Sequence, residues 1–404
     1  MKVLQVHNAY VSPGGEDTVV EQERSSLIQA GVEVRTLTTK NRPSSDALTD
    51  SLKATRVIWS TGGQAALKLA VAQFNPDVIH IHNTHYEFGP AIFWAARGTR
   101  LPVVMTAHNY RLMCSNALFL RDNRPCELCL HGAHWNAVRY KCYRNSRSAS
   151  AAMAAGLLLH RRLLRTYERC VTKIICLTEF QRQKLVASGL SASQLVVKDN
   201  QVIQDPSQFG APRNERTGTY LYTGRLSPEK GVDLLLHAWR SRTRQGTRLV
   251  IAGDGPEHQH LRSIVAGRDD VEMLGWQDQA SVRALMRRAD WVVLPSRWYE
   301  GSPLVLAEAH AQGTPVIVPA HGSFTTLVSE GVNGRFFGPG DASALSRVLD
   351  ETSQMGPESW TRYSSGARSS AVARAESTRT SKLIGIYEAS ITSNTLNGWA
   401  RVGQ

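Results

Sequence analysis

The segment DWVVLPSRWYEGSPLVLAEAHAQGTPVIVPA, residues 290–320, shows how the second half of the chain is expected to fold. It opens with the apolar run DWVVLPS, continues through the helical pattern PLVLAEAHAQG and closes with a second apolar run, TPVIVPA. Neither run alternates between apolar and polar residues, which is typical of strands buried on both faces of a sheet. The order strand, helix, strand therefore predicts two parallel strands joined by a helix.

The same alternation extends along the rest of the chain. Further strand patterns are KVLQVHNA, PDVIHIHN and PVVMTAHN in the first half, and a second series begins at TYLYTGRL, near Thr219. The 404 residues are too many for one ordinary core, and 42% of them are apolar, which is enough for two. We therefore predict an α/β protein with two domains, each built on a parallel sheet covered by helices.

Composition suggests where the domains begin and end. The polar segment VIQDPSQFGAPRNERTG is rich in Pro, Gly and Arg, as linkers are. We predict an N-terminal domain over residues 1–203, a linker over 204–218 and a C-terminal domain over 219–376. Residues 377–404 are expected to form an amphipathic helix that packs back on the N-terminal domain, followed by a tail.

Positive charge is concentrated in one region. The formal net charge is +13, and thirteen Arg and Lys residues stand against three acids between Arg97 and Arg169. Such a region suits nucleic acid, an anionic membrane surface or a phosphorylated substrate, or it is simply a solvated basic face. Nucleic acid is disfavoured because aromatic residues are not interleaved with the charges and no nucleic-acid motif is present.

The chain shows no pattern for export or for crossing a membrane. The apolar run at the N-terminus is too short for a signal peptide, and no stretch reaches the roughly 20 apolar residues that span a bilayer. We expect a cytoplasmic protein with reduced cysteines. The basic segment AAMAAGLLLHRRLLRTYERC, residues 151–170, predicts an amphipathic helix that either lies on an anionic membrane or packs within the protein.

The loop inside residues 290–320 carries the chemistry. Ser302 and Pro303 are expected to cap and open a helix, whose N-terminal N–H groups favour an anion. Gly301 allows close approach to the backbone. A diphosphate over this helix start would leave Glu300 for sugar hydroxyls and Glu308 for a ribose. The alternative is a capped core helix with two incidental acids, although an unpaired buried carboxylate such as Glu308 is costly.

The Glu-x7-Glu spacing of Glu300 and Glu308 resembles the signature of glycosyltransferase family 4. Further segments resemble that family in the same order, namely SPGGEDTVVEQ, VVMTAHN, VIQDPSQF, YTGRLSPEKGVDLLL, LVIAGDGPE and VEMLGWQD. The resemblance implies the GT-B fold, in which two Rossmann-like, doubly wound domains face a central cleft. It also implies a retaining glycosyltransferase of the bacterial surface-polysaccharide type.

The resemblance assigns roles to individual residues. Arg225 and Lys230 would hold the diphosphate and neutralise the leaving group, and His108 would face the donor sugar. The implied catalytic residues are Glu300, His108, Arg225 and Lys230, and the implied donor-binding residues are Gly14, Gly15, Arg225, Lys230, Gly301, Ser302, Leu304 and Glu308. No metal or other cofactor is implied for catalysis, because the cations and the helix end would take its place.

The implied reaction moves a hexose-type sugar from a nucleotide-diphosphate donor to a hydroxyl of a glycan or lipid-linked acceptor. The cell-surface polysaccharide setting places the protein in the cytoplasm or on the inner face of the cell membrane. Two alternatives remain open. One is a nucleotide-sugar epimerase on the same fold, and the other is a non-catalytic protein that binds an anionic ligand or nucleic acid.

Four cysteines lie in an insert at about residues 110–147. Cys126 and Cys129 have the Cys-x2-Cys spacing of a zinc chelate, and Cys114 and Cys142 could complete four ligands, with His131 and His134 as substitutes. The spacing lacks a second Cys-x2-Cys pair. The hypothesis of a structural zinc at Cys114, Cys126, Cys129 and Cys142 therefore stands beside that of four reduced thiols.

Overall fold

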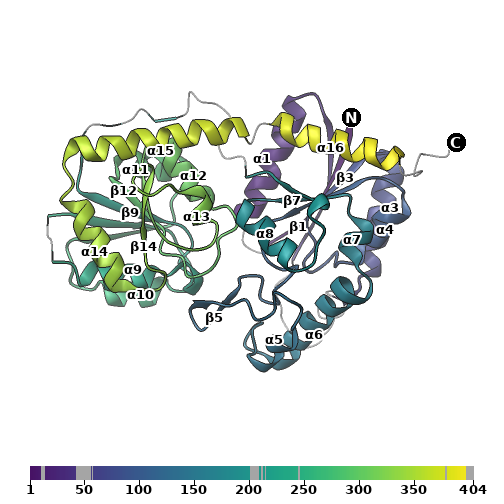
Figure 1. Cartoon of the computed structure of the whole chain (residues 1–404), viewed down its shortest axis with the longest axis horizontal. Coiled ribbons are helices and arrows are strands. Elements are labelled where there is room, and N and C mark those ends of the chain that lie inside the picture. Colours follow the sequence, from purple (N-terminus) through teal and green to yellow (C-terminus); the bar gives the residue numbers. More distant parts are fainter. Residues whose placement is uncertain are drawn as a thin grey trace. The chain divides into compact units, whose positions relative to one another are not determined.

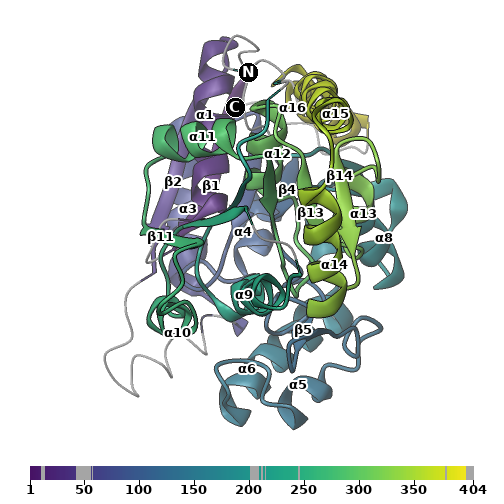
Figure 2. The same ribbon diagram turned by 90° about the vertical axis from the view of Figure 1, so that its left-hand side faces the viewer.

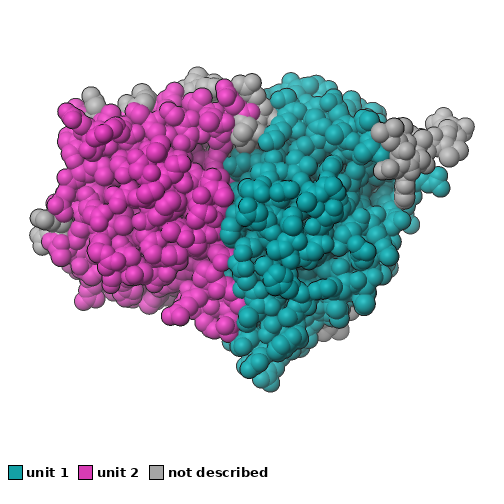
Figure 3. Space-filling view, in the orientation of Figure 1, with its two compact units in different colours: residues 1–119, 127–201, 378–404 teal, residues 120–126, 202–377 magenta. Residues whose placement is uncertain are grey.

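The computed structural model describes residues 1–10, 14–41, 56, 58–200, 209–210, 213, 215–243, 246–377 and 380–396. The chain divides into two compact units (Figure 3). Unit 1 comprises Met1–Phe119, Glu127–Gln201 and Thr378–Gln404, and unit 2 comprises Leu120–Cys126 and Val202–Ser377. Most of the predicted linker, and the predicted tail beyond residue 396, lie outside the described residues.

Unit 1 is built on one parallel sheet. Its strands are β1 (Lys2–Ala9), β2 (Glu33–Lys40), β3 (Val78–Asn83), β4 (Val103–Ala107), β7 (Lys173–Cys176) and β8 (Leu195–Val197). The strand order is β2-β1-β3-β4-β7-β8, so the chain winds outward from β1 in both directions. Every residue of β3 and β4 is buried, including the polar His80, His82 and Asn83 of β3, as expected of strands that are covered on both faces of a sheet.

Helices surround this sheet. They are α1 (Gly15–Gln29), α3 (Thr61–Phe74), α4 (Ile92–Gly98), α5 (Trp135–Arg139), α6 (Arg147–Leu157), α7 (Thr166–Cys170), α8 (Glu179–Ala187) and α16 (Thr380–Leu396). The last helix, α16, lies beside α1 (Figure 1). Its residues Leu383, Ile386 and Tyr387 join the core formed by Val3 and Val78. Residues from the two ends of the described chain therefore share one hydrophobic core.

The predicted helix over residues 151–170 is not continuous, and that prediction is wrong. The chain passes from α6 into the π-helix η1 (Leu158–Leu163) and then into α7. Arg165, between them, has the left-handed φ of 51°, which ends one helix and reorients the next. His160 and Arg161 are buried, so the segment does not present one basic face to solvent.

Unit 2 repeats the architecture with another parallel sheet. Its strands are β9 (Thr219–Thr223), β10 (Arg248–Ala252), β11 (Val271–Gly275), β12 (Trp291–Val293), β13 (Val316–Pro319) and β14 (Gly334–Phe337), in the order β11-β10-β9-β12-β13-β14. A short hairpin, β5 (Leu120–Arg121) with β6 (Arg124–Pro125), is grouped with this unit. The strand–helix–strand unit predicted over residues 290–320 is present as β12, α12 (Leu304–Ala311) and β13, with the strands paired in parallel.

Helices cover both faces of the second sheet. They are α9 (Val232–Arg240), α10 (His258–Ile264), α11 (Gln279–Arg288), α12, α13 (Phe324–Leu327), α14 (Ala342–Ser353) and α15 (Pro357–Ser377), with the 3₁₀ turn η4 (Pro228–Lys230) before α9. One core lies under α9 and α14 and another under α11 and α12. Figure 2 shows the four helices beside the strands of this sheet. Both units thus have the doubly wound α/β architecture that the sequence predicts.

Candidate functional site

Glu300 and Lys230 meet at the carboxyl end of the unit 2 sheet. Lys230 closes the turn that follows β9, and Glu300 lies in the loop between β12 and α12. The Lys230 ammonium donates to Glu300 Oε1 at 2.9 Å, and the Ser296 hydroxyl donates to the same oxygen at 2.6 Å. Glu300 is 5% exposed, so its carboxylate is held in one position by two donors. The structure therefore brings together two of the predicted catalytic residues.

Two close contacts hold the Lys230 and Glu300 loops against each other. Gly231 has φ of 68°, and a Cβ there would lie 2.3 Å from the carbonyl oxygen of Pro295, so only glycine fits. Arg297 forms a bidentate ion pair with Asp233, with N–O distances of 2.8 and 2.7 Å. The planar fork of arginine makes such a pair geometrically specific. The Lys-Gly dipeptide thus fixes where Lys230 lies relative to Glu300.

Arg225 lies in the preceding loop with its side chain exposed. Its guanidinium makes no hydrogen bond or ion pair with the residues that the structure describes. Its backbone is nevertheless fixed, because the Tyr222 hydroxyl donates to the Arg225 carbonyl at 2.8 Å. The adjacent loops also touch, since a Cβ on Gly253 would lie 1.9 Å from the Gly224 carbonyl oxygen. An arginine whose backbone is fixed and whose guanidinium is exposed is suited to binding an anion.

Helix α12 begins one residue later than the sequence predicts. Its first residue is Leu304, and Pro303 occupies the N-cap position without a side-chain cap. The prediction that Ser302 caps the helix and Pro303 opens it is therefore wrong, because Pro303 has the extended ψ of 120°. Gly301 and Ser302 both lie in the loop just before the helix. The N–H groups of the first turn remain available to an anion, as at any helix start.

Glu308 lies one turn further along α12 and is 9% exposed. Its Oε1 accepts from the Gln279 side-chain amide at 3.2 Å. Burial raises the pKa of Glu308, and the Gln279 hydrogen bond and the charge of Arg283 only partly oppose that rise. A buried carboxylate with one amide donor still has oxygen lone pairs for ligand hydroxyls.

Several neighbours of Glu300 were not predicted to have a role. The Ser323 hydroxyl donates to the Glu300 carbonyl, and His321 Nε2 lies 3.0 Å from the Ser296 carbonyl oxygen. Burial lowers the pKa of His321, while Glu300 opposes this shift. The Lys230 ammonium lies 5.4 Å from the Trp298 ring centre. The position of His321 just after β13 is the signal that could have identified it, because ligands bind at that edge of such sheets.

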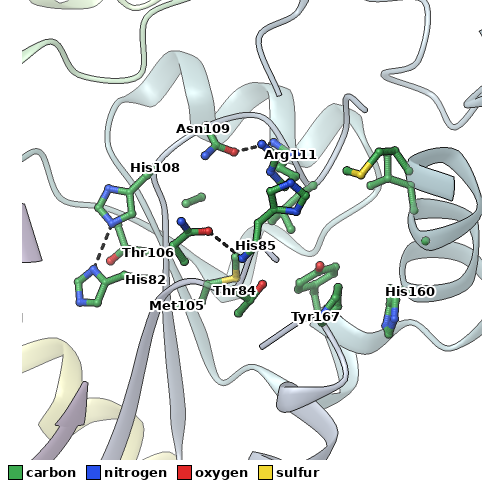
Figure 4. A pocket seen from close by; sticks show the side chains of 18 residues that line it. His82, Thr84, His85, Met105, Thr106, His108, Asn109, Arg111, His160 and Tyr167 are labelled. Carbon is green, nitrogen blue, oxygen red and sulfur yellow. Dashed lines mark hydrogen bonds between the residues drawn. The ribbon is translucent and has the colours of Figure 1, made fainter. Parts of the chain in front are cut away.

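His108, the predicted catalytic residue of unit 1, follows β4 and begins a line of buried groups. Its Nε2 lies 3.1 Å from His82 Nδ1 (Figure 4). His82 Nε2 lies 3.7 Å from Glu23 Oε2, and Glu23 Oε1 accepts from the Lys198 ammonium at 2.8 Å. All of these side chains are buried. His108 is therefore positioned by a series of buried ionisable groups that begins with His82.

Burial and charge set the protonation of this line. Burial lowers the pKa of both His108 and His82, so both rings are neutral near pH 7. Burial by itself raises the pKa of Glu23, but the charge of Lys198 and its hydrogen bond, with the nearby imidazoles, leave that pKa lowered. Lys198 and Glu23 thus form a charged pair that polarises His82.

A cavity of about 70 Å³ lies beside His108 in unit 1. Its lining includes the polar residues Asn83, His85, Asn109 and Arg111 and the apolar residues Met105, Leu112, Met153 and Leu157. Asn109 accepts from the Arg111 backbone N–H at 3.0 Å, as Figure 4 shows. A cavity lined by both hydrogen-bonding and apolar groups is suited to binding a small polar ligand.

Gly14 and Gly15 lie at the start of α1 in the same unit. Gly14 occupies the N-cap position with an extended φ of −134°, and its N–H donates to Asp17 Oδ2 at 2.8 Å. The other oxygen of Asp17 lies 2.8 Å from His7 Nε2. The glycine pair therefore lies near another buried histidine, and residues 11–13 just before it are outside the described part of the chain.

The predicted zinc ligands are not gathered into a metal site. Among the described residues, one group of three or more potential ligand atoms lies within 4.8 Å of one another, and it consists of Glu23, His80 and His82. Burial raises the pKa of the Cys114 thiol, which disfavours the thiolate that zinc binds. The structure thus gives no support to a zinc site at Cys114, Cys126, Cys129 and Cys142.

Comparison with known protein families assigns each half of the chain. The family model described as Glycosyl transferase 4-like domain matches residues 14–201, and the model described as Glycosyl transferases group 1 matches residues 204–369. Residues 14–201 and residues 204–369 are thus each similar to a glycosyltransferase domain.

Individual relatives match only part of this chain. An exopolysaccharide phosphotransferase of Streptomyces coelicolor is 33% identical over 192 residues, 44% of this chain and 19% of that protein. Alpha-D-kanosaminyltransferase of Streptomyces kanamyceticus is 32% identical over 140 residues, 32% of this chain and 36% of that protein. The chain therefore spans between 19% and 36% of the length of these two curated relatives.

Solved structures match nearly the whole chain. The Anabaena protein HepE, solved in complex with UDP and glucose, is 18% identical with a TM-score of 0.65, and the match covers 96% of this chain and 100% of that one. Together with the two parallel sheets, this likeness shows the α/β GT-B fold. None of the helices in the described residues is long and apolar enough to span a bilayer.

Proposed function

We propose that this protein is a retaining glycosyltransferase of family 4 that moves a sugar from a nucleotide-diphosphate donor to a hydroxyl acceptor. The observation that carries the proposal is the buried Glu300 carboxylate, held by Lys230 and Ser296 beside the start of α12. The UDP and glucose bound by the Anabaena protein support this class of donor.

Residues 219–376 are proposed to bind the donor. Departure of a nucleoside diphosphate builds negative charge in the transition state. Arg225, Lys230 and the N–H groups from Leu304 onward would neutralise that charge, so catalysis is proposed to need no divalent metal. Glu300 would accept hydrogen bonds from sugar hydroxyls, and Glu308 would accept those of the ribose. Gly301 and Ser302 would lie against the phosphates.

Residues 1–203 are proposed to bind the acceptor and to contribute His108. The Glu23 carboxylate favours a proton on the His82 nitrogen that faces it. The other nitrogen of neutral His82 is then an acceptor, so His108 donates to it from Nε2. This leaves His108 Nδ1 as an acceptor for a hydroxyl of the transferred sugar. Gly14 and Gly15 would allow close approach of the sugar or phosphate.

The acceptor is proposed to be a glycan or a lipid-linked glycan in cell-surface polysaccharide synthesis. The exopolysaccharide relative supports this setting. Work on such an acceptor would take place at the cytoplasmic face of the membrane. Exposed Leu158 and Leu163 lie close in sequence to exposed Arg162 and Arg165, a combination that suits an anionic membrane surface.

The donor is identified first. Thermal unfolding is measured against a panel of nucleotide sugars, because a ligand that binds only the folded state raises its Tm. The best donor is then incubated with and without candidate acceptors. Sugar transfer with retained anomeric configuration, seen by NMR, supports the proposal. Isomerised sugar without an acceptor would instead establish the epimerase alternative, and binding without any reaction would establish a non-catalytic protein.

A further inference from the structure

A second cavity in unit 1, of about 220 Å³, is strongly basic. It lies between the insert and the segment that contains η1 and α7. Its polar lining comes from His134, Arg161, Arg162, Arg165, Glu168 and Ser188. Three guanidinium groups against one carboxylate leave it a net charge of +2. Nothing in the proposed chemistry at Glu300 or His108 uses these residues.

Arg161 is built into the wall of this cavity. Its side chain is 6% exposed, and Nη2 donates to the Ser188 carbonyl at 2.9 Å and to the Ser188 hydroxyl at 3.0 Å. Its Nη1 is buried without a hydrogen-bond partner among the described residues, and the nearest carboxylate oxygen, on Glu168, lies 3.5 Å away. A buried guanidinium nitrogen that has an ion pair but no hydrogen bond can still donate to an oxygen of a ligand.

His134 provides a second, independent sign of a ligand. It is 7% exposed, and its Nδ1 is also buried without a hydrogen-bond partner. Burial and the charges of Arg161 and Arg162 lower the pKa of His134 to about 4. An anion in the cavity would raise this pKa, because it would accept a hydrogen bond from His134 and balance the charges of the two arginines. Arg161 Nη1 and His134 Nδ1, which belong to different segments, therefore both lack a hydrogen-bond partner among the described residues.

The local backbone brings the remaining two arginines to this cavity. A Cβ on Gly132 would lie 2.2 Å from Arg162 Nη2, so glycine makes room for the guanidinium, which donates to the His131 carbonyl at 2.6 Å. Arg165 has the left-handed φ of 51°, which is unfavourable for a non-glycine residue. It lies two residues after the end of a π-helix, a local structure that is frequent at functional sites.

We propose that this cavity binds a phosphate or diphosphate group carried by the acceptor. Arginine forks match the oxygens of phosphate groups bidentately, and three of them suit an anion with more than one charge. The cavity shares Leu112 with the cavity beside His108, so the charged group of an acceptor would lie next to its reacting sugar. The role as an acceptor subsite rests on the proposed function, whereas phosphate binding itself does not.

The test follows the His134 ring by NMR while the full-length protein is titrated with inorganic pyrophosphate. Binding in the cavity is expected to shift the His134 signals and to raise its pKa. The exposed pair is then changed in R162Q/R165Q, which should weaken this binding by about tenfold or more. Arg139→Gln is the matched control, because Arg139 is exposed on the same insert but does not line the cavity.

Vesicles separate the two sources of phosphate. Phosphatidylcholine vesicles doped with farnesyl diphosphate are compared with vesicles given the same charge by phosphatidylglycerol. A His134 shift with farnesyl diphosphate vesicles and a weak response to free pyrophosphate indicates a lipid-linked group, whereas an equal response indicates a soluble phosphate. Both results support the site.

The proposal is overturned if neither probe moves the His134 signals, or if R162Q/R165Q binds pyrophosphate as tightly as the wild type. Donor binding is measured on the same samples by thermal shift. Loss of the phosphate site with intact donor binding would refute this inference alone, and failure of donor binding would count against the proposed function.

Discussion

One Lys–Glu pair in each unit lies beside the proposed chemistry, and the two pairs have nearly equal lengths but very different surroundings. Lys230 and Glu300 in unit 2 are 2.9 Å apart, with side chains 26% and 7% exposed. Lys198 and Glu23 in unit 1 are 2.8 Å apart, with side chains 1% and 3% exposed. The exposed ammonium of Lys230 can exchange its partner for a ligand, whereas Lys198 is enclosed. The first pair is suited to binding and the second to positioning His82 and His108.

The largest effect on stability is expected from breaking the buried Lys198–Glu23 pair. Lys198→Met leaves the Glu23 carboxylate buried without its cation, which typically costs about 3–5 kcal/mol of stability. Chemical denaturation of the purified protein measures this loss. Changing both partners, in Lys198→Met with Glu23→Leu, should recover most of it, because no uncompensated charge remains. A single variant as stable as the wild type would show that the pair does not hold unit 1 together.

Glu300→Gln tests the partly exposed Lys230–Glu300 pair, and the measurement is enzymatic activity. We expect kcat to fall about 100- to 1000-fold, to turnover near zero, because the neutral amide neither balances Lys230 nor accepts sugar hydroxyls as strongly. Initial rates at saturating donor measure the effect, and circular dichroism should show an unchanged fold. Glu272→Gln, an exposed change in the same unit, is the control. Normal turnover by Glu300→Gln would contradict the assigned role of this carboxylate.

Lys230→Met should separate binding from stability. Because Lys230 is partly exposed and water can reach the site it leaves, its loss is expected to cost less stability than the loss of the enclosed Lys198. Donor affinity should fall about tenfold, since a charge-assisted contact to the diphosphate is lost. Calorimetric titration with the identified donor measures the affinity. Strong destabilisation with unchanged affinity would reverse the contrast between the two pairs.

A smaller effect on stability is expected when the pH is lowered. The pKa of Glu23 is lowered in the folded protein, so its contribution to stability is present above the ordinary glutamate pKa of about 4.3 and is lost as the pH falls towards the folded value. The double variant Lys198→Met with Glu23→Leu lacks this group. Its stability should therefore fall less steeply than that of the wild type below this pH, as denaturant melts would show. Parallel curves would mean that Glu23 does not contribute.

Much of unit 2 could be predicted because its signals are local. Unbroken apolar runs predict buried parallel strands, and Glu300 and Lys230 both follow strands whose carboxyl ends share one edge. The exact start of α12 could not be predicted, because Ser302 and Pro303 each fit a helix start in isolation. The backbone angle of Pro303 is set by the loop around it.

Unit 1 was less predictable because its important contacts join distant segments. Charged residues such as Glu23 and Lys198 are normally exposed, and they are separated by 175 positions, so no local pattern indicates their pairing. The break at Arg165 is equally hidden, since residues 151–170 carry no proline and one early glycine. Packing of His160 and Arg161 against other segments outweighs the intrinsic preference of that stretch for one continuous helix.

The position of α16 bears on how unit 1 can form during synthesis. The Tyr387 hydroxyl lies 2.7 Å from His80 Nδ1, a contact between residues 307 positions apart, and both side chains are buried. The part of the first sheet that α16 covers therefore stays exposed until this last described helix has left the ribosome. A chain shortened to residue 377 should retain a foldable unit 2 and expose an apolar, aggregation-prone surface on unit 1.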